Sequence, residues 1–513
     1  MTSAPASTAA RSAYDRLVER FREQHLLDGA ASILSWDRET MMPGGGVAFR
    51  GEQLALLASL SHRIATDPEL GDLLEAADAE TADADEGDPR RVNVREWRRD
   101  RDRNLKLPEA LVKELAEVAS TAQHEWAEAR KANDYARFKP WLGKLVDLNR
   151  RKAECLGWAE GGEPWDALGD LYEPGSTAAE IEAVFTPLQQ RLKGLVARIA
   201  EAPTRPDDTF DRLELPQAQQ EAFVRFVAEQ FGFDFDRGRL DTSTHPFCGG
   251  SHRNDVRLTT RFHSNLTLDA LGSTMHEVGH GLYEQGLPQE HLGTPMGEAA
   301  SLSVHESQSR MWENQVGRSR PFWTWLTPEL PRFFGDAVDG LGIEEMYGAA
   351  NRVQPGLIRV EADEATYNLH IMIRFDLERR MLRGDLPLDD LPAAWNDAYR
   401  DLLGLEVPDD ARGCLQDIHW SMGAMGYFPT YTLGNLVSAG LFDAAVEAMP
   451  DLPDQFARGE FDGLRTWLNE NVHAHGRRHR FLELHRLVTG REVGADPLLR
   501  YLEGKLLPLH GLA

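Results

Sequence analysis

The segment His276-Glu277-Val278-Gly279-His280 combines two histidines and a glutamate at a spacing that suits metal chemistry. Residues four apart lie on one face of an α-helix, so both imidazoles can bind a single cation. The glutamate between them can then reach a water molecule on that cation and accept its proton. So short a pattern also arises by chance, and a plain surface pair of histidines is the alternative. The pattern therefore needs a third ligand before it predicts a metal site.

A third ligand is required because catalytic zinc usually has three protein ligands and one open position. The extended pattern with a third histidine on the same segment is absent. Tyr283 and Gly286 occupy the positions of its glycine and its histidine. A carboxylate from a second helix is then the expected third ligand.

Residues 298–316 (EAASLSVHESQSRMWENQV) are predicted to form that second helix, which Gly317 would end. The helix offers three carboxylates. Glu306 lies near its middle and is the favoured ligand, and Glu298 is the alternative. Glu313, like Glu298 when it is not a ligand, is expected to be surface charge or to support the ligands from behind.

The two histidines and Glu306 form a donor set that suits zinc and tolerates cobalt. A helix must hold the histidines, and residues 268–285 are predicted to form it, because apolar residues recur there at helical spacing. Thr267 is the expected N-cap and Gly286 the expected C-terminal stop.

Residues 255–262 alternate with a period of two and predict a short β-strand. The two faces of this strand hold Val256, Leu258 and Phe262, and Arg257, Thr259 and Arg261, respectively. A strand with one buried face and one cationic face would make a good wall for a substrate groove.

The rest of the chain predicts a mainly α fold, in which long amphipathic patterns alternate with short Gly- and Pro-containing breaks. No repeat or linker divides it, so residues 1–513 are expected to form one domain despite a length that could hold several. Residues 1–9 are expected to be frayed, and a helix is predicted from residue 10 to about residue 27. Residues 35–46 and the acidic stretch 73–89 are predicted to be loops.

The chain carries 56 Lys and Arg against 83 Asp and Glu, a formal net charge of −27. A surface this acidic repels nucleic acids and anionic membranes, so neither is an expected partner. Cys155, Cys248 and Cys414 do not form a disulfide framework and fit a reducing cytoplasm. The N-terminus lacks the apolar segment of a secretory signal, and no stretch of about 18 apolar residues predicts a membrane span. A cytoplasmic protein is therefore expected.

Short motifs follow one another along the chain: SWD (35–37), HPF (245–247), DVRLT (255–259), HEVGH (276–280), HESQ (305–308), IRVEAD (358–363), GCLQDIHW (413–420) and GYFPTY (426–431). In this order they resemble the HExxH metallocarboxypeptidases of the carboxypeptidase Taq family. The resemblance covers essentially the whole chain, and neither the metal positions nor the base position departs from it.

The resemblance implies a large, mainly helical metallopeptidase fold with a deep substrate groove, the metal at its floor and a small β element beside the active site. It implies a carboxypeptidase of broad specificity, a divalent metal, zinc or cobalt, and usually a homodimer. Glu306 matches the third metal ligand of that family, which agrees with the choice made from spacing alone.

Peptide hydrolysis at such a site assigns a role to Glu277. A divalent ion lowers the pKa of a bound water, and Glu277 would take the proton as the water attacks the scissile carbonyl. The same carboxyl would later deliver that proton to the leaving amine. Tyr427, Tyr431 and His419 are candidate donors to the developing oxyanion, and core packing with a satisfied polar tip is their alternative.

A carboxypeptidase must also bind the terminal carboxylate of its substrate, which needs a paired cation. Arg257 and Arg359 are the candidates. The alternative is a structural ion pair for each, Arg257 with Asp255 and Arg359 with Glu361 or Asp363. His245 is expected to line the groove, with a capped turn before a proline as the alternative. Gln416 and Asp417, together with His419, are expected to form a polar network near the site or within the core.

Two other functions remain open from the residues alone. The same zinc site on a related fold would make the protein an endopeptidase or a dipeptidase. A helical peptide-binding protein with a structural metal is the non-enzymatic alternative. Glu277 argues against the second, because a structural zinc site has four protein ligands and needs no base.

Overall fold

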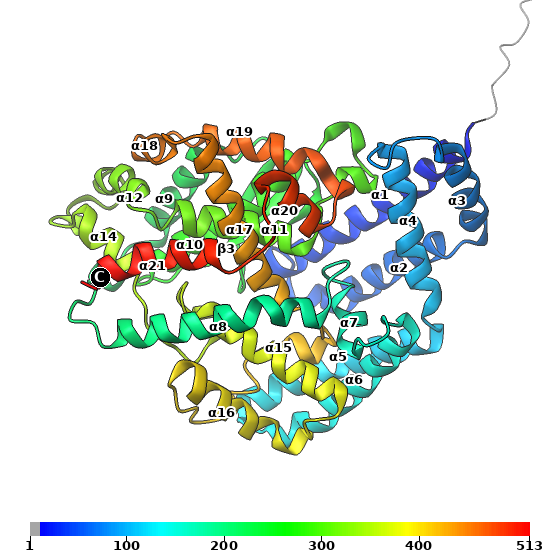
Figure 1. Ribbon diagram of the computed structural model, residues 1–513, viewed down its shortest axis with the longest axis horizontal. Helices are drawn as coiled ribbons and strands as arrows, with labels where there is room; N and C mark the ends of the chain where they lie inside the picture. Colours follow the sequence, from blue (N-terminus) through cyan, green and yellow to red (C-terminus); the bar gives the residue numbers. More distant parts are fainter. Residues whose placement is uncertain (1–10, 513) are drawn as a thin grey trace, which may run out of the picture.

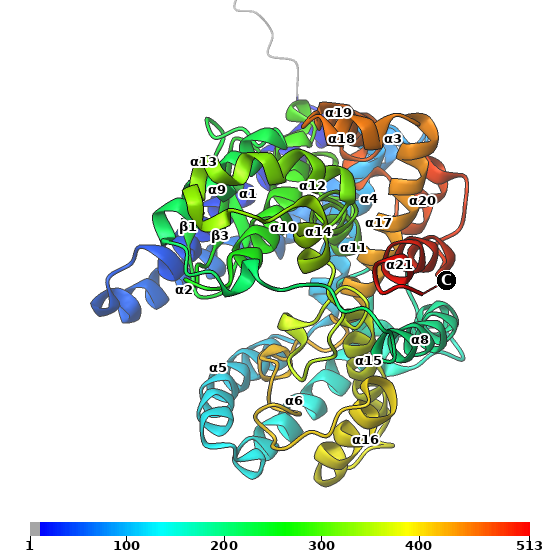
Figure 2. The same ribbon diagram turned by 90° about the vertical axis from the view of Figure 1, so that its left-hand side faces the viewer.

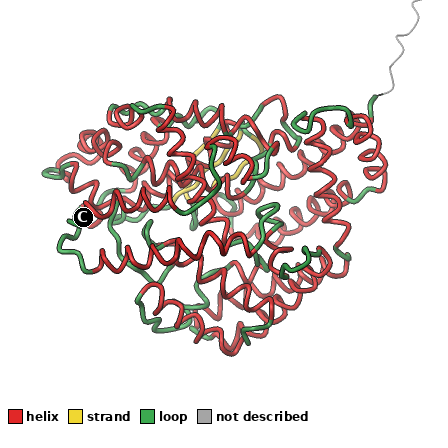
Figure 3. Tube along the Cα trace, in the orientation of Figure 1, coloured by secondary structure: helices red, strands yellow, loops and turns green. Residues whose placement is uncertain are grey.

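The computed structural model describes residues 11–512, and helices account for most of them (Figures 1 and 3). The predicted mainly α fold with a small β element is confirmed. The helices of the N-terminal half are α1 (Ala13–Thr40), α2 (Val47–Ala65), α3 (Pro68–Thr81), α4 (Pro89–Lys106), α5 (Glu109–Ala132), α6 (Tyr135–Leu156), α7 (Pro164–Gly169), α8 (Ala178–Ala200) and α9 (Gln217–Gln230). Those of the C-terminal half are α10 (Thr267–Gly286), α11 (Leu302–Arg310), α12 (Arg320–Leu326), α13 (Leu330–Phe334), α14 (Ile343–Ala350), α15 (Tyr367–Arg383), α16 (Leu391–Leu403), α17 (Pro429–Ala448), α18 (Leu452–Ala457), α19 (Asp462–Asn471), α20 (Phe481–Thr489) and α21 (Asp496–Leu509).

One continuous hydrophobic core runs through the helices from Ala122 to Leu506. A smaller cluster of apolar side chains joins α1, α3 and α4. Figure 2 shows α5, α6, α15 and α16 on one side of the molecule and α9 to α14 on the other, with α17 and α21 beside the latter. Between residues 11 and 512, no helix is both long and apolar enough to cross a membrane.

A three-stranded sheet lies beside α10 and consists of β1 (Gly238–Thr242), β2 (Cys248–His252) and β3 (Asp255–Thr260). Its order is β1-β3-β2, with β1 parallel and β2 antiparallel to β3. The predicted strand is therefore present, but it ends at Thr260. Val256 and Leu258 are buried as expected. Thr259 on the supposed cationic face is also buried, because its hydroxyl binds Ser243 and the backbone of the β1–β2 loop.

The two helices predicted to carry the metal ligands are both present, with shifted ends. α10 begins at Thr267, so Leu266 and not Thr267 is the N-cap. α11 begins at Leu302 rather than at residue 298, because the Ser301 hydroxyl accepts a hydrogen bond from the Val304 amide and caps the helix there. The chain then continues as a π-helical turn, Met311–Val316, before Gly317.

Two predicted loops near the N-terminus are in part helical. α1 continues through residues 35–40, because Trp36 is buried and the Asp37 carboxylate pairs with Arg50 of α2. α3 takes up residues 73–81 of the acidic stretch, so only residues 82–88 form a connection. Leucines and alanines at helical spacing face the core while the acidic residues face water. The high content of acidic residues favoured a loop over this amphipathic helix. The frayed segment expected at residues 1–9 lies outside the described residues.

Candidate metal centre

Two glycines bring the helices of the candidate site close together. A Cβ on Gly279 of α10 would lie 2.6 Å from the Gln308 carbonyl oxygen and 2.6 Å from the Ser309 Cα on α11. A Cβ on Gly434 of α17 would lie 2.6 Å from the Glu306 Cγ. Real Cβ atoms do not approach so closely, so only glycine permits this packing. The glycine within the histidine motif therefore lets the second helix reach the first.

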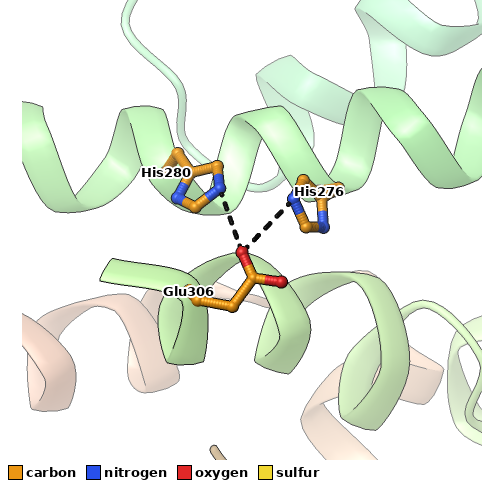
Figure 4. Close-up of side chains that lie close together, drawn as sticks. All are labelled: His276, His280 and Glu306. Carbon is orange, nitrogen blue, oxygen red and sulfur yellow. Dashed lines mark ion pairs between the residues drawn. The ribbon is translucent and has the colours of Figure 1, made fainter. Parts of the chain in front are cut away.

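His276, His280 and Glu306 converge at this contact (Figure 4). The Glu306 Oε2 lies 3.6 Å from the His276 Nε2 and 3.5 Å from the His280 Nε2, and all three donor atoms lie within 4.8 Å of one another. Bonds of about 2.0–2.2 Å from each donor to one cation fit that spacing. Two imidazoles and one carboxylate are also a donor set that zinc accepts in catalytic sites. The residues present therefore fit a divalent metal.

The outer nitrogen of each histidine also has a partner. The His276 Nδ1 lies 3.0 Å from the Glu313 Oε2, and the His280 Nδ1 lies 2.5 Å from the His305 Nδ1. Partners on Nδ1 leave both Nε2 atoms pointing at the shared site. Of the two roles expected for Glu313, support of the ligands is the one its position allows.

Arg310 holds the acidic side of the site. Its Nε donates to the Glu306 Oε1 at 2.7 Å, its Nη1 donates to the Glu313 Oε2 at 3.0 Å, and its guanidinium lies over the Tyr367 ring. Burial alone would raise the pKa of Glu313, but Arg310 and the contact with His276 hold it well below its usual range. Arg310 therefore occupies the Oε1 of Glu306, whereas the Oε2 accepts a longer hydrogen bond of 3.2 Å from the Ser309 hydroxyl and faces both imidazoles.

Glu277 is almost fully buried beside the ligands, with 5% of its surface exposed. Burial raises the pKa of its carboxyl to about 7, and the charge of Glu306 adds to this shift while His276 opposes it. A carboxyl with a pKa near neutrality can both take up and release a proton at physiological pH. The geometry therefore provides an acid–base group next to a cation site.

Both arginines expected to bind a substrate carboxylate already have protein partners. The Arg359 Nε donates to the Asp417 Oδ1 at 2.8 Å and its Nη1 to the Tyr367 hydroxyl at 3.2 Å, and its guanidinium lies over the Tyr431 ring. The Arg257 Nε donates to Asp255 at 2.9 Å, and its guanidinium stacks on Trp36. The Arg257–Asp255 ion pair named as the alternative is therefore present. Arg359 is also in an ion pair, but with Asp417 and not with the neighbouring acids Glu361 or Asp363.

His419, Tyr427 and Tyr431 form one aromatic group close to Glu306. The Tyr427 and Tyr431 ring centroids are 5.4 Å apart, and the Tyr431 hydroxyl lies 3.5 Å from the His419 Nε2. Burial lowers the pKa of His419 to about 4, and its Nδ1 has no hydrogen-bond partner within residues 11–512. Burial raises the pKa of both tyrosines, and the charge of Glu306 contributes to each shift. At neutral pH, all three residues can therefore donate a hydrogen bond.

Two other candidates lie apart from this group. His245 is exposed in the loop between β1 and β2, and Glu298 pairs with Arg477 at 2.8 Å. Glu298 is therefore not the third member of the cluster.

The polar network expected around Gln416 and Asp417 is present, and Arg374 completes it with hydrogen bonds of 2.8 Å to Gln416 and 2.7 Å to Asp417.

Sequence reasoning gave no role to several supporting residues. Arg310 lies four residues after Glu306, and that helical spacing of opposite charges could have suggested their pairing. His305, Glu284 and Tyr367 have no such local signal, because their contacts depend on how α10, α11 and α15 pack.

Residues 16–506 match the model of the family described as carboxypeptidase Taq (M32) metallopeptidase. The chain is 44% identical to thermostable carboxypeptidase 1 of Thermus thermophilus, over 97% of this chain and 99% of that one. It is 34% identical to carboxypeptidase 1 of Bacillus subtilis, over 94% of this chain and 95% of that one. The crystal structure of an M32 carboxypeptidase from Deinococcus radiodurans superposes with a TM-score of 0.94 at 41% identity, covering 98% of this chain and 100% of that one.

Proposed function

This chain belongs to the carboxypeptidase Taq (M32) family of metallopeptidases, and we propose that it releases C-terminal residues of many kinds from peptides. Metal-dependent carboxypeptidase hydrolysis follows from the family. The finer assignment has one main support, the convergence of His276, His280 and Glu306 beside the buried Glu277. These three residues are the proposed metal ligands, and Glu277 is the proposed general base.

The proposed reaction uses the protein groups in a fixed order. A divalent cation held by the three ligands would supply Lewis acidity at the scissile carbonyl and make a water molecule easier to deprotonate. Glu277 takes the proton of the attacking water and passes it to the leaving amine. Tyr427, Tyr431 and His419 donate hydrogen bonds to the oxyanion that forms.

Substrate binding is proposed to depend on charge more than on side-chain shape. Arg359 and Arg257 would share their guanidinium groups between their present acidic partners and the terminal carboxylate of the peptide. His245 would contact the peptide farther along the sheet. Recognition of the terminus rather than of the last side chain would allow a broad choice of residues.

We expect the protein to shorten a free-acid peptide one residue at a time and to leave the same peptide with an amidated C-terminus intact. An amide has no negative charge for the arginines to bind, so productive binding is lost. Mass spectrometry of paired time courses, with and without a chelator, measures this.

The same peptide with its N-terminus acetylated is the control, and its rate should not change. Equal cleavage of the acid and the amide would contradict the exopeptidase assignment and favour an endopeptidase. Hydrolysis of free dipeptides with longer peptides left intact would favour a dipeptidase.

Zinc is the proposed metal, with cobalt as a working substitute, because the site offers two nitrogens and one oxygen. Metal analysis of protein purified without added metal tests this, and a stoichiometric metal other than zinc would contradict it.

A cytoplasmic location is proposed because all three cysteines are free. Recovery of the protein in an oxidising compartment by cell fractionation would contradict it.

Residues 1–513 are proposed to act as one catalytic domain, because the main core is continuous from Ala122 to Leu506. A single cooperative transition in calorimetry is the expected sign of this. Two well-separated transitions would contradict it.

We expect the protein to be a homodimer that pairs through α2. This helix projects from the body and contacts little besides α1 (Figure 2). Phe49 and Leu56 lie two turns apart on one side of it and are 66% and 60% exposed. Apolar side chains grouped on a projecting helix commonly mark a protein interface. Light scattering should therefore give twice the chain mass, and the double variant Phe49→Asp, Leu56→Asp should be a monomer.

Ala58→Asp provides the matched control, because this exposed residue lies on the opposite side of α2. The control should remain dimeric. A monomeric wild type, or a double variant that is still dimeric, would contradict the proposed interface.

A further inference from the structure

His280 contacts a histidine and a carboxylate arranged in series behind it. The Nδ1 of His280 lies 2.5 Å from the Nδ1 of His305, and the Nε2 of His305 lies 2.8 Å from the Oε1 of Glu284. His280 and Glu284 are on α10, four residues apart, whereas His305 is on α11 immediately before Glu306. One carboxylate and one imidazole thus follow His280 on the side away from Glu306.

These contacts permit only one set of proton positions when His280 binds a cation. An imidazole ligand needs a free lone pair, so the Nε2 of His280 carries no proton and its Nδ1 carries the ring proton. That Nδ1–H can donate to His305 only if the Nδ1 of His305 is unprotonated. The ring proton of His305 is then on Nε2, and it is donated to the Glu284 carboxylate.

We propose that His305 and Glu284 are positioning residues that hold His280 in the tautomer and ring orientation needed to bind the metal. The proposal rests on the assignment of His280 as a metal ligand. Glu284 anchors the proton of His305, His305 accepts the proton of His280, and the Nε2 of His280 is left facing Glu306. The two adjacent residues thus have different roles: Glu306 is a proposed ligand, and His305 supports the ligand His280.

The two histidine ligands differ in how they are supported. His276 contacts the carboxylate of Glu313 directly, and Arg310 and Arg318 hold that carboxylate in place. The Nδ1 of His280 instead contacts the ring of His305, which stands between it and the Glu284 carboxylate. The intervening imidazole transmits the orienting effect of Glu284, so loss of either residue should weaken the hold on His280.

The surroundings of the pair make the proposal testable. His305 and Glu284 border a cavity of about 220 Å³, together with His25 and Cys248. Their side chains keep 21% and 31% of their surface exposed, so substitutions there need not disturb the core. The ring planes of His280 and His305 are stacked at a tilt, and phenylalanine can preserve that packing without accepting a hydrogen bond.

The experiment measures the dissociation constant for Zn²⁺ alone, by competition with a chelator and without any peptide. His305→Phe should raise it about 10- to 100-fold, the usual cost of losing a partner behind a metal ligand. His305→Gln should restore most of the affinity, because its carbonyl oxygen can accept from His280 and its amide can donate to Glu284. Glu284→Leu should also weaken binding, and Glu284→Gln should weaken it less.

A second readout separates positioning from general stability. The visible spectrum of the Co²⁺-loaded protein should change in His305→Phe and return toward that of the wild type in His305→Gln. The melting temperature of the chelated protein should stay the same in all variants. His25→Phe is the matched control, because His25 lines the same cavity outside the pair, and it should leave Zn²⁺ binding unchanged.

Wild-type Zn²⁺ affinity in both His305→Phe and Glu284→Leu would overturn the proposal. A loss of affinity matched by an equal loss of stability in the chelated protein would also overturn it, since the contacts would then be structural. A wild-type protein that binds no Zn²⁺ would instead refute the metal centre itself. The two failures are distinguishable, because the wild type still binds Zn²⁺ when only the positioning role is wrong.

Discussion

Replacing Glu277 with glutamine is expected to lower kcat/KM by about 10²- to 10⁴-fold while the bound metal stays at one ion per chain. The amide has nearly the shape of the carboxyl but cannot accept a proton from the attacking water. Glu277 is buried next to the ligands, so bulk water cannot easily replace it as the base. Steady-state kinetics on a free-acid peptide, together with metal analysis of the same samples, measures both quantities.

The pH profile gives the same prediction a second readout. Only the ionised carboxyl accepts a proton, so kcat/KM should fall as the pH drops through the pKa of Glu277. Burial raises that pKa to about 7, and a bound cation acts in the opposite direction, so the midpoint should lie below 7. The residual activity of Glu277→Gln should lack this acid limb.

Glu290→Gln is the control, because Glu290 is an exposed carboxylate shortly after α10. It should retain the activity and the acid limb of the wild type. Near-normal turnover in Glu277→Gln would show that another group is the base.

Glu306→Gln is expected to weaken metal binding by at least about 100-fold, more than the loss of a supporting residue costs, and to abolish turnover without added metal. The Oε2 of Glu306 lies 3.6 Å from the Nε2 of His276 and 3.5 Å from the Nε2 of His280, so one cation can bind all three atoms. A neutral amide is a poorer ligand, and it also removes one of the two carboxylates that pair with Arg310. Equilibrium dialysis followed by metal analysis measures the loss.

Glu298→Gln is the control matched to this change, because both carboxylates belong to the segment from which the third ligand was predicted. Glu298 pairs with Arg477 and should not affect metal binding. Full metal content in Glu306→Gln, or loss of metal in Glu298→Gln, would show that Glu306 is not the third ligand.

The metal cluster could be predicted from the sequence because its information is local. The spacing of His276 and His280 fixes their common face, and only a few carboxylates lie on the next helical segment. The close approach of that segment depends on Gly279. The sequence shows that this residue is a glycine, but it does not show that α11 packs against it. The support of His280 by His305 and Glu284 depends on the same packing and was therefore not predictable.

The substrate candidates show a second limit. Arg359 and Asp417 are 58 residues apart, and only the packing of their two loops brings them together at 2.8 Å. The sequence offered nearer acids, Glu361 and Asp363, as partners for Arg359, but the Asp363 carboxylate instead accepts hydrogen bonds from the Ala365 and Thr366 amides in the turn before α15. The lengths of α1 and α3 were underestimated for a related reason, since a glycine-rich end and an acidic composition outweighed the apolar spacing.

Anomalous diffraction from crystals of the zinc-loaded protein tests the central claim most directly. The peak should lie about 2.0–2.2 Å from the Nε2 of His276, the Nε2 of His280 and one oxygen of Glu306, with at least one position open to solvent. A peak elsewhere in the chain, or a fourth protein ligand closing the coordination shell, would contradict it.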